Sequence, residues 1–411
     1  MPNATPERAL KRRHLLSLLA ASATAITLPG CGAGPSDERY NQADIDLLKR
    51  QRDEEAKTAG KGPHGMHRYQ GYRGLAELPW FELDSTGQLV CIDDTLPMGI
   101  DIHCHLGMSV LFSPKIDLNQ ATPRVKHLLD CDGSTPGCEL DLDIYANGNF
   151  TLEMENELQK QIRDQGLFGS EFAATQTIPN LLREMDTMRM EQAVLLPIKL
   201  GIWIGDDLTE QWNESVNSAG AQKRLVVGGS IHPESDNAIA ELKAQAAAGA
   251  KIFKLHPTVQ RFYPDDPKVM SLYEVAQDLG VAIFFHGGRA GIEPQSSHPY
   301  AMPRHYEAAV ASFPKLQFIL GHSGARDFNA MLELAVAYDN AWLGIHGQSV
   351  TNLETMINRT GGERMLFGTD WPFYHIGMSL AKVLITTAQP NRKPIRDAIL
   401  RNNALALFSQ R

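Results

Sequence analysis

The stretch GIDIHCHLG, residues 99–107, places two histidines at the end of a short apolar run. His103 and His105 are two positions apart, so in a β-strand their side chains point to the same face. We expect Ile100 and Ile102 to face surrounding helices and both imidazoles to point into the mouth of the fold. Two imidazoles on one strand can bind one metal ion, although such a pair also occurs in ordinary protein cores.

From residue 98 onward, short apolar runs alternate with helical patterns. The eight runs are GIDIHCH (99–105), AVLLPIK (193–199), RLVVGGSIH (224–232), KIFKLH (251–256), VAIFFHGG (281–288), LQFILGHSG (316–324), AWLGIHG (341–347) and RMLFGTDWP (364–372). Strand–helix alternation favours parallel strands, because a parallel return needs a crossover connection. Eight such units predict an α/β fold of the (β/α)8 TIM-barrel type. The glycine fingerprint of a dinucleotide-binding sheet does not follow the first run.

Composition shifts divide the chain into three parts. Residues 1–31 are expected to form an export signal, and residues 32–96 a polar tether with a short solvated helix and a small β-hairpin. Residues 97–411 form the barrel domain. The long segment 106–170 interrupts the alternation after the first strand, and on a barrel it would sit on the catalytic face. It is either a lid or an arm with a structural or oligomer-contacting role.

The first 31 residues have a basic start, an apolar stretch and a small-residue end. Arg12 and Arg13 before HLL resemble a twin-arginine signal. The sequence LPGC, which ends at Cys31, resembles a bacterial lipobox, so Cys31 is predicted to be lipidated; cleavage without lipid is the alternative. The protein is therefore expected in the periplasm or cell envelope, in contact with the membrane only through its anchor.

Charge and cysteine content exclude several classes of partner and site. The 411 residues carry a formal net charge of −9 and no basic stripe, so nucleic acid is excluded as a partner and a small-molecule substrate is expected. Cys131 and Cys138 flank the turn-rich loop DGSTPG and either form a disulfide in an oxidising compartment or stay as thiols. The chain contains no CxxC pair, which argues against a thiolate zinc site.

Other strands of the predicted barrel also end in metal-binding residue types. The runs that begin at residues 251, 281, 316 and 364 carry His256, His286, His322 and Asp370 at or near their ends. Because the carboxyl ends of all barrel strands meet at one mouth, these side chains are expected to converge. Buried polar groups lose hydration, and a divalent cation compensates by binding their lone pairs. Imidazoles with one carboxylate suit zinc, iron or manganese.

These motifs together resemble a known family. DIHCHLG, FKLHP, FFHGG, ILGHSG and LFGTDWP, in this order, are similar to the amidohydrolase superfamily, and in particular to its amidohydrolase-2 branch with the aminocarboxymuconate-semialdehyde decarboxylase-like enzymes. The resemblance runs from about residue 97 to the end, where LRNNALALF (400–408) resembles the closing helix of that branch.

The resemblance implies roles for five residues. His103, His105, His286 and Asp370 would bind one divalent metal ion, with zinc expected and manganese or iron as alternatives. Asp370 would also take a proton from the bound water, and His322 would polarise the substrate or relay protons as a catalytic residue. Related enzymes often form dimers, so a homodimer is a further implication.

Weaker candidates surround this set. His256 could contact substrate or lie behind the ligands, or be an ordinary structural histidine, and Lys254 bridging two metal ions is the minority hypothesis. Arg289 could bind a substrate carboxylate, although a surface-loop role is favoured. Trp371 could form the wall of the pocket or simply pack in the core.

The remaining histidines on or near the same face are expected to be mostly bystanders. They are His232, His298, His305 and His346. The sequence thus predicts a metal-dependent hydrolase of the amidohydrolase superfamily that cleaves an amide, lactone or ester bond. The alternatives are a non-oxidative decarboxylase or hydratase that uses the same metal site on a carboxylated substrate, and a catalytically silent barrel lipoprotein that only binds ligand.

Overall fold

The computed structural model divides into two compact units, residues 1–45 and 46–411, and the second contains the barrel. The described residues are 39–107, 116–128, 139–146, 156–160, 164, 171–202, 206 and 208–409. Cys31, Cys131, Cys138 and much of the segment 106–170 lie outside them, so lipidation and the disulfide stay predictions.

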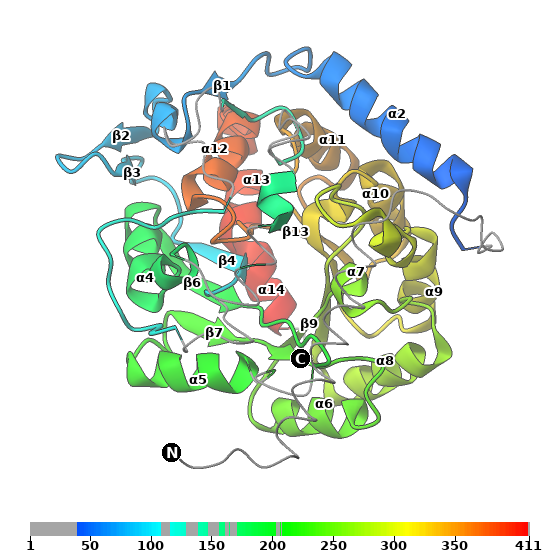
Figure 1. The fold of residues 1–411 in the computed structure, drawn as a ribbon. Coiled ribbons are helices and arrows are strands. Elements are labelled where there is room, and N and C mark those ends of the chain that lie inside the picture. Colours follow the sequence, from blue (N-terminus) through cyan, green and yellow to red (C-terminus); the bar gives the residue numbers. More distant parts are fainter. Residues whose placement is uncertain are drawn as a thin grey trace, which may run out of the picture. The chain divides into compact units, whose positions relative to one another are not determined.

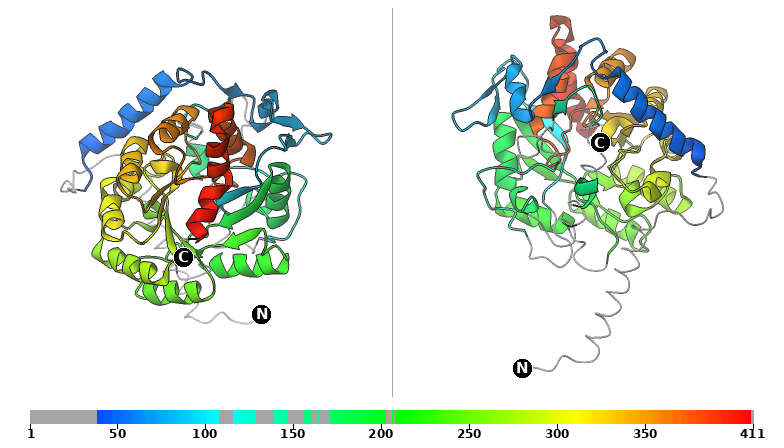
Figure 2. Two further views of the ribbon diagram at one scale, coloured as in Figure 1. Left: turned by 180° about the vertical axis from the view of Figure 1, so that it is seen from behind. Right: turned by 45° about the horizontal axis from the view of Figure 1, so that its top comes forward.

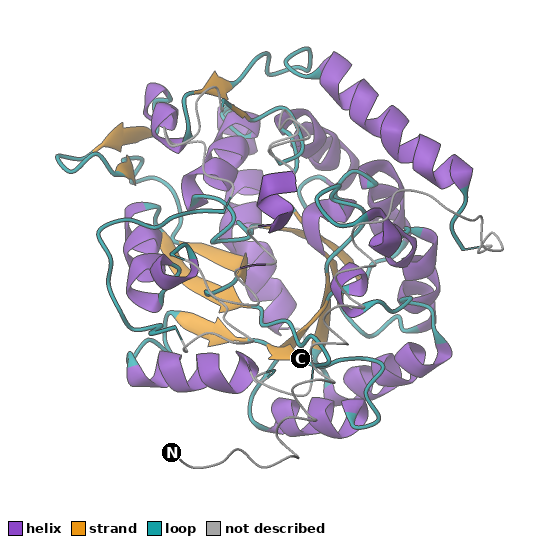
Figure 3. Ribbon diagram, viewed as in Figure 1, coloured by secondary structure: helices purple, strands orange, loops and turns teal. Residues whose placement is uncertain are grey.

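Eight parallel strands form the wall of the second unit, with β7 and β8 as two parts of one strand (Figures 1 and 3). They are β4 (Gly99–Cys104), β6 (Met190–Leu195), β7 (Leu225–Val227) with β8 (Gly229–Ser230), β9 (Ile252–Leu255), β10 (Ala282–Phe285), β11 (Phe318–Leu320), β12 (Ala341–Gly344) and β13 (Met365–Leu366). Each strand pairs with the next in this order. The amide of Ile102 donates to the carbonyl of Phe367 (3.0 Å) and that of Asp370 to the carbonyl of His103 (2.8 Å), which links the last strand to the first. The predicted TIM-barrel class is confirmed.

Helices cover the outside of the strand wall and one end of the barrel (Figure 3). They are α4 (Ile178–Thr187), α5 (Leu208–Ser218), α6 (Ala238–Ala247), α7 (Pro257–Gln260), α8 (Pro267–Leu279), α9 (Arg304–Ser312), α10 (Phe328–Ala337), α11 (Val350–Thr360), α12 (Ile376–Thr386), α13 (Lys393–Asp397) and α14 (Asn403–Ser409). Pro267 begins α8 after the cap Asp266, and Gly280 with φ of 65° ends it, so ordinary start and stop signals set this helix. Among the helices that the structure describes, none has both the length and the apolar character to cross a membrane.

Two apolar clusters lie on the two faces of the strands. The smaller one fills the barrel and takes residues from β4, β6, β9, β10, β11, β12 and β13, while the larger one lies between strands and helices. Ile100 and Ile102 belong to the inner cluster, so the expectation that they face the helices is wrong. The reason is a register shift in the β4–β6 pairing between Asp101 and Cys104, which breaks the alternation and still lets His103 point inward.

The last helix covers one end of the barrel. Ala404 and Leu407 of α14 pack against the inner cluster, which includes Ile100 and Leu366 near the starts of their strands. Figure 2 (left) shows α14 crossing the barrel from behind. The functional residues lie at the opposite end of the barrel, which the carboxyl ends of the strands form.

The segment before the barrel contributes a hairpin and a helix. β2 (Phe81–Leu83) and β3 (Leu89–Cys91) pair antiparallel, and α2 spans Gln42–Thr58. The residues of α2 that belong to the second unit contact loops that follow the barrel strands, so this helix is not solvated on all sides as predicted. Arg52 donates to the carbonyl of Gly291 (2.9 Å), and a carboxylate oxygen of Glu55 lies 2.5 Å from the Arg326 guanidinium.

Candidate metal centre

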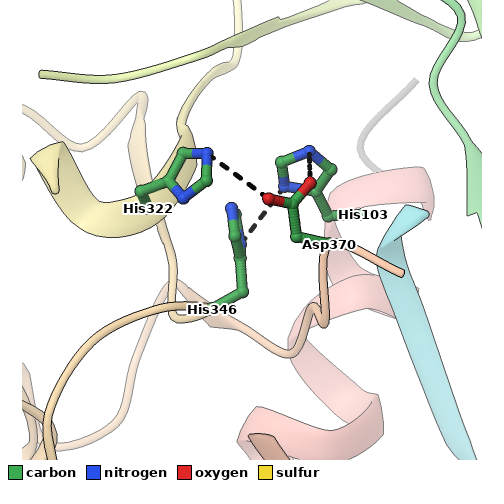
Figure 4. Close-up of side chains that lie close together, drawn as sticks. All are labelled: His103, His322, His346 and Asp370. Atoms are coloured by element: carbon green, nitrogen blue, oxygen red, sulfur yellow. Dashed lines mark hydrogen bonds and ion pairs between the residues drawn. The ribbon is translucent and has the colours of Figure 1, made fainter. Parts of the chain in front are cut away.

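Five polar side chains meet where the barrel strands end. His103 belongs to β4 and His105 follows it, while His322, His346 and Asp370 follow β11, β12 and β13. The carboxyl ends of barrel strands form one face, so residues far apart in the chain become neighbours. Figure 4 shows the rings of His103, His322 and His346 around the carboxylate of Asp370.

The shortest distances join three atoms that we call the ligand triangle: Nε2 of His103, Nε2 of His105 and Oδ1 of Asp370. The two nitrogens are 3.1 Å apart, and they lie 3.2 and 3.1 Å from the oxygen. Ligand atoms that bind a tetrahedral zinc ion at about 2.0–2.1 Å are roughly 3.3 Å from one another. The ligand triangle therefore has nearly the spacing of one face of a metal site.

The carbonyl oxygen of Leu196 fixes the proton of His105. It lies 2.7 Å from Nδ1 and can only accept a hydrogen bond, so Nδ1 carries a proton. A neutral His105 then turns the lone pair of Nε2 toward Oδ1 of Asp370, which is also an acceptor. Two acceptors 3.1 Å apart repel each other unless a proton or cation lies between them. The donor set thus fits a bound divalent cation.

Burial sets the charges around this triangle. Burial puts the pKa of His103 well below 6.5, and the charges of His346 and Lys254 lower it further. Burial also puts the pKa of His322 well below 6.5. For Asp370, burial alone would raise the pKa, but the hydrogen bond and charge of a protonated His105 outweigh burial and lower the pKa; where His105 is neutral, a bound cation would supply that positive charge instead. Neutral imidazoles with an ionised carboxylate are ligands suited to zinc, manganese and iron.

A wider set overlaps the triangle. His103, His322, His346 and Asp370, which we call the four-residue group, are all buried and have ligand atoms within 4.8 Å of one another. Nε2 of His322 is 4.0 Å from Oδ2 of Asp370. Residues of this group could hold a divalent cation, and histidine with aspartate is the predicted combination of ligand types.

The backbone is strained at two of these residues. His322 has a φ of 56° and Asp370 a φ of 59°, values in the left-handed region that cost a non-glycine residue about 1–3 kcal/mol. Gln348 stabilises the first turn, because its amide donates to the carbonyl oxygens of His322 (2.5 Å) and Ala325 (2.9 Å). Strain of this kind is typical of functional sites, where surrounding contacts hold the conformation.

Lys254 of β9 also points into the metal centre. Its Nζ lies 3.1 Å from Nε2 of His103 and 4.6 Å from the centre of the Phe284 ring. Burial lowers the pKa of Lys254 to about 7, although the charge of Asp370 opposes the shift. One metal ion stays the prediction, and a bridging role of Lys254 between two ions stays the minority hypothesis.

His286, predicted as a ligand, lies beside the four-residue group. Its ring stacks on His256 with centroids 4.0 Å apart, and its centroid is 4.5 Å from that of His322. Burial lowers the pKa of His286 to about 3, so the ring is neutral. Its role as a ligand stays a prediction, and so does the substrate contact of His256.

Two weaker candidates lie away from the ligands. Arg289 is fully buried and forms a forked ion pair with Asp327 (2.8 and 2.5 Å), so its guanidinium is neither in a surface loop nor turned to a substrate carboxylate. The ring of Trp371 is also fully buried, and its Nε1 donates to Glu184 (3.2 Å), which places it in the core.

Two residues that sequence reasoning missed reach the metal centre. His346 was grouped with the residues expected to be mostly bystanders. The run AWLGIHG carries this histidine near its end, as KIFKLH carries His256 at its end, so the same strand-end rule would have selected it. Tyr145 comes from the segment 106–170, and its hydroxyl lies 3.1 Å from Nδ1 of His322. No periodic signal in that segment indicates Tyr145.

Comparison with known families agrees with this geometry. The family model described as amidohydrolase matches residues 100–410, which span the barrel from β4 to α14. The chain belongs to the amidohydrolase family. The resemblance inferred from the strand-end motifs is confirmed.

The amidohydrolase chain is also similar to solved structures of low sequence identity. A TIM-barrel protein of unknown function from Bordetella bronchiseptica is 18% identical with a TM-score of 0.54, over 76% of this chain and 98% of that one. A 5-carboxyvanillate decarboxylase from Sphingomonas paucimobilis is 15% identical with a TM-score of 0.48, over 61% and 90% of the two chains. A 2,6-dihydroxybenzoate decarboxylase from Rhizobium is 16% identical with a TM-score of 0.45, over 75% and 98%. The first of these supports the barrel fold, and a search of curated proteins found no match.

Proposed function

We propose that this amidohydrolase-family protein is a metal-dependent hydrolase that cleaves an amide, lactone or ester bond of a small molecule. The ligand triangle is the observation that carries the proposal. In it, Nε2 of a neutral His105 turns its lone pair toward the Asp370 carboxylate, so two acceptors face each other without a proton between them. Membership of the amidohydrolase family supports the same conclusion.

One divalent cation is proposed, with zinc favoured and manganese or iron as alternatives. His103, His105 and Asp370 would hold it, with His286 as a further ligand. When bound there, such a cation would lower the pKa of water from far above neutral to about 7 and so supply a nucleophile at neutral pH.

Tyr145 sets the proton of His322 in the proposed mechanism. Burial raises the pKa of Tyr145 well above 10, so the hydroxyl stays protonated. In the part of the chain that the structure describes, its hydrogen-bonding partner is Nδ1 of His322 (3.1 Å). When Tyr145 donates to Nδ1, a neutral His322 carries its own proton on Nε2. That N–H faces the carboxylate of Asp370 and can polarise a substrate oxygen or protonate a leaving group.

Asp370 has a second role through its other oxygen. Oδ1 belongs to the ligand triangle, whereas Oδ2 faces Nε2 of His322 at 4.0 Å. Burial alone would raise the pKa of Asp370, but positive charge beside the carboxylate, from a protonated His105 or from a bound cation, outweighs burial and lowers the pKa, so Asp370 is ionised at neutral pH. Oδ2 can therefore accept a proton from the attacking water and return it to Nε2 of His322 once that nitrogen has protonated the leaving group.

The described part of the segment 106–170 helps to exclude bulk water. Tyr145 is only 4% exposed, and its ring fits against Gly347, whose φ is 80°. A Cβ at position 347 would lie 2.8 Å from the Tyr145 ring, so this close approach needs glycine. A low-dielectric site strengthens the electrostatic contacts of His322 and Asp370.

The test combines metal analysis with a substrate screen. The protein is loaded separately with zinc, manganese or iron, and bound metal is measured after removal of excess. The loaded protein is then screened against amides, lactones and esters. We expect one bound ion per chain and hydrolysis that needs it. Absence of bound metal would overturn the proposal.

Two other outcomes would assign a different function. Release of carbon dioxide from a carboxylated substrate, without hydrolysis, would indicate the non-oxidative decarboxylase. Bound metal with ligand binding but no turnover across the screen would indicate a barrel that only binds its ligand.

The proposed location is the periplasm or cell envelope, with a lipid anchor at Cys31. The sequence features that support it are Arg12, Arg13 and the LPGC motif. Replacing Arg12 and Arg13 together by lysine should keep the precursor in the cytoplasm, and normal processing of that variant would exclude the twin-arginine route.

A further inference from the structure

His346 has one ring nitrogen with no hydrogen-bond partner. Its Nε2 is buried and makes no hydrogen bond to any described residue, and the residue as a whole is 1% exposed. Figure 4 shows the ring of His346 standing between His322 and Asp370, with one nitrogen turned into the space between them. A buried polar atom without a partner costs free energy, so this atom is expected to meet a ligand.

The other ring nitrogen of His346, Nδ1, forms a hydrogen bond with His103. The two Nδ1 atoms lie 3.2 Å apart, so one of them donates a proton to the other. Nε2 of His103 belongs to the ligand triangle and must offer a lone pair to a cation. A neutral His103 then carries its proton on Nδ1 and donates it to Nδ1 of His346. A neutral His346 must therefore carry its proton on Nε2.

This hydrogen bond excludes one arrangement of the four-residue group. If Nε2 of His346 were to bind the cation, its proton would move to Nδ1, and His103 would have to accept it there. Nε2 of His103 would then carry a proton and could not be a ligand. As neutral rings, His103 and His346 cannot both bind the cation through Nε2.

A second N–H donor lies next to His346. The ring centroids of His322 and His346 are 4.0 Å apart, and when Tyr145 donates to Nδ1 of His322, as in the proposed mechanism, the proton of His322 lies on Nε2. Both protonated nitrogens border the space in front of Asp370 (Figure 4). The nearby Nζ of Lys254 adds to the same preference for negative charge.

We propose that His346 is a substrate-binding residue that, together with His322, donates two hydrogen bonds to an anionic oxygen of the substrate, and that it is not a metal ligand. The inference rests on the proposed function, because it needs His103 to bind the cation. It narrows the substrate class to small molecules that place a carboxylate, or an oxygen that becomes anionic during hydrolysis, beside the bond to be cleaved.

The tautomer can be measured directly. The full chain is labelled with nitrogen-15 at histidine and loaded with zinc, and the ring signals of His346 are assigned by their loss in His346→Asn. Chemical shifts that show a protonated Nε2 and an unprotonated Nδ1 support the proposal. An unprotonated or zinc-bound Nε2 overturns it.

A pair of substitutions separates the two nitrogens of His346. Asparagine places an acceptor near the position of Nδ1 but has no group at Nε2, whereas glutamine places a donor near Nε2. We expect His346→Asn to retain zinc and to bind benzoate, a simple carboxylate probe, at least tenfold more weakly than the unsubstituted protein. His346→Gln should recover part of this affinity.

The matched control is His232→Asn. Nδ1 of His232 also accepts a hydrogen bond, in this case from the backbone amide of Glu234, so asparagine can likewise supply an acceptor near this position. This variant should retain both zinc and benzoate affinity.

The outcomes distinguish this inference from the proposed function. If the unsubstituted protein holds zinc and His346→Asn loses it, His346 is a ligand and the inference fails while the proposed function stands. Unchanged benzoate affinity in His346→Asn also overturns the inference. If the unsubstituted protein holds no metal, the proposed function fails, and nothing then requires the proton of His103 to lie on Nδ1.

Discussion

Nε2 of His105 and Oδ1 of Asp370 lie 3.1 Å apart, in residues that are both over nine-tenths buried. The carbonyl of Leu196 holds the proton of His105 on its other nitrogen, so the contact joins two acceptors when the ring is neutral. The two residues come from opposite ends of the barrel sequence, and the seam between β4 and β13 brings them together. A bound cation gives this contact a physical reason.

Asp370→Asn is expected to lower the affinity for zinc by roughly 10–100-fold or more, because even supporting partners of metal ligands have effects of this size. The substitution keeps the shape of the side chain but removes its negative charge. Zinc bound after dialysis against a competing chelator provides the measurement. Asp265→Asn is the control, since Asp265 contacts His305 outside the metal centre. Equal zinc retention in both variants would contradict the role of Asp370 as a ligand.

Tyr145→Phe is expected to slow substrate turnover about fivefold to tenfold and to leave zinc content unchanged. The hydroxyl sets the proton of His322, and a single lost hydrogen bond is worth about 1 kcal/mol. Rates are measured at saturating substrate, with zinc content determined on the same samples. Tyr273→Phe is a matched control, because the buried hydroxyl of Tyr273 has no hydrogen-bond partner among the described residues. A loss of zinc in Tyr145→Phe would show that Tyr145 supports the ligands instead.

The sequence predicted the barrel because its signals are local and repeated. Each strand is an apolar run, and the helical patterns between these runs correspond to helices such as α6 and α8. Strand ends of a parallel barrel converge whatever their distance in the chain, so His103, His105, His322 and Asp370 could be selected as one group.

The same reasoning could not identify contacts that depend on pairing across the fold. Arg289 and Asp327 are 38 residues apart, and no periodicity links them. The inward position of Ile100 depends on a register shift in β4, which a strict two-residue period cannot anticipate. Tyr145 reaches His322 from a segment without periodic pattern, so only a structure could place it.

Glu184→Gln is expected to destabilise the protein by roughly 3 kcal/mol at pH 7, because Glu184 is the buried partner of several donors. Its Oε2 lies 3.0 Å from Nε2 of His127 and accepts from Nε1 of Trp371, and its Oε1 accepts from the amide of Ile376. Glutamine would place an amide N–H₂ against one of these donors. Urea denaturation measures the change.

The difference in stability between the unsubstituted protein and the Glu184→Gln variant should depend on pH. Burial alone would raise the pKa of Glu184, but the charges of His375 and His127 outweigh it and lower the pKa to about 2 from an ordinary 4.5. A lowered pKa stabilises the fold above pH 4.5, and this contribution disappears as the pH falls through about 2. The two urea curves should therefore approach each other below pH 4.5. A difference that stays constant down to pH 2 would contradict the ionised state of Glu184.

Arg289→Met is expected to destabilise the protein by about 3–5 kcal/mol, because it leaves the carboxylate of Asp327 buried without its cation. Asp327→Leu should lower the free energy of unfolding by a similar amount, since it leaves the Arg289 guanidinium buried without this carboxylate. The double variant removes both charges, so its loss of stability should be smaller than the sum of the two single losses. Urea denaturation of the unsubstituted protein, the two single variants and the double variant measures these free energies of unfolding.

The control is the ion pair of Arg359 with Glu333, which has comparable distances but is exposed. Arg359→Met should therefore change stability little. Additive effects at Arg289 and Asp327 would show that the two side chains are not coupled, and zinc retention in Arg289→Met would confirm that the pair acts on stability and not on the metal centre.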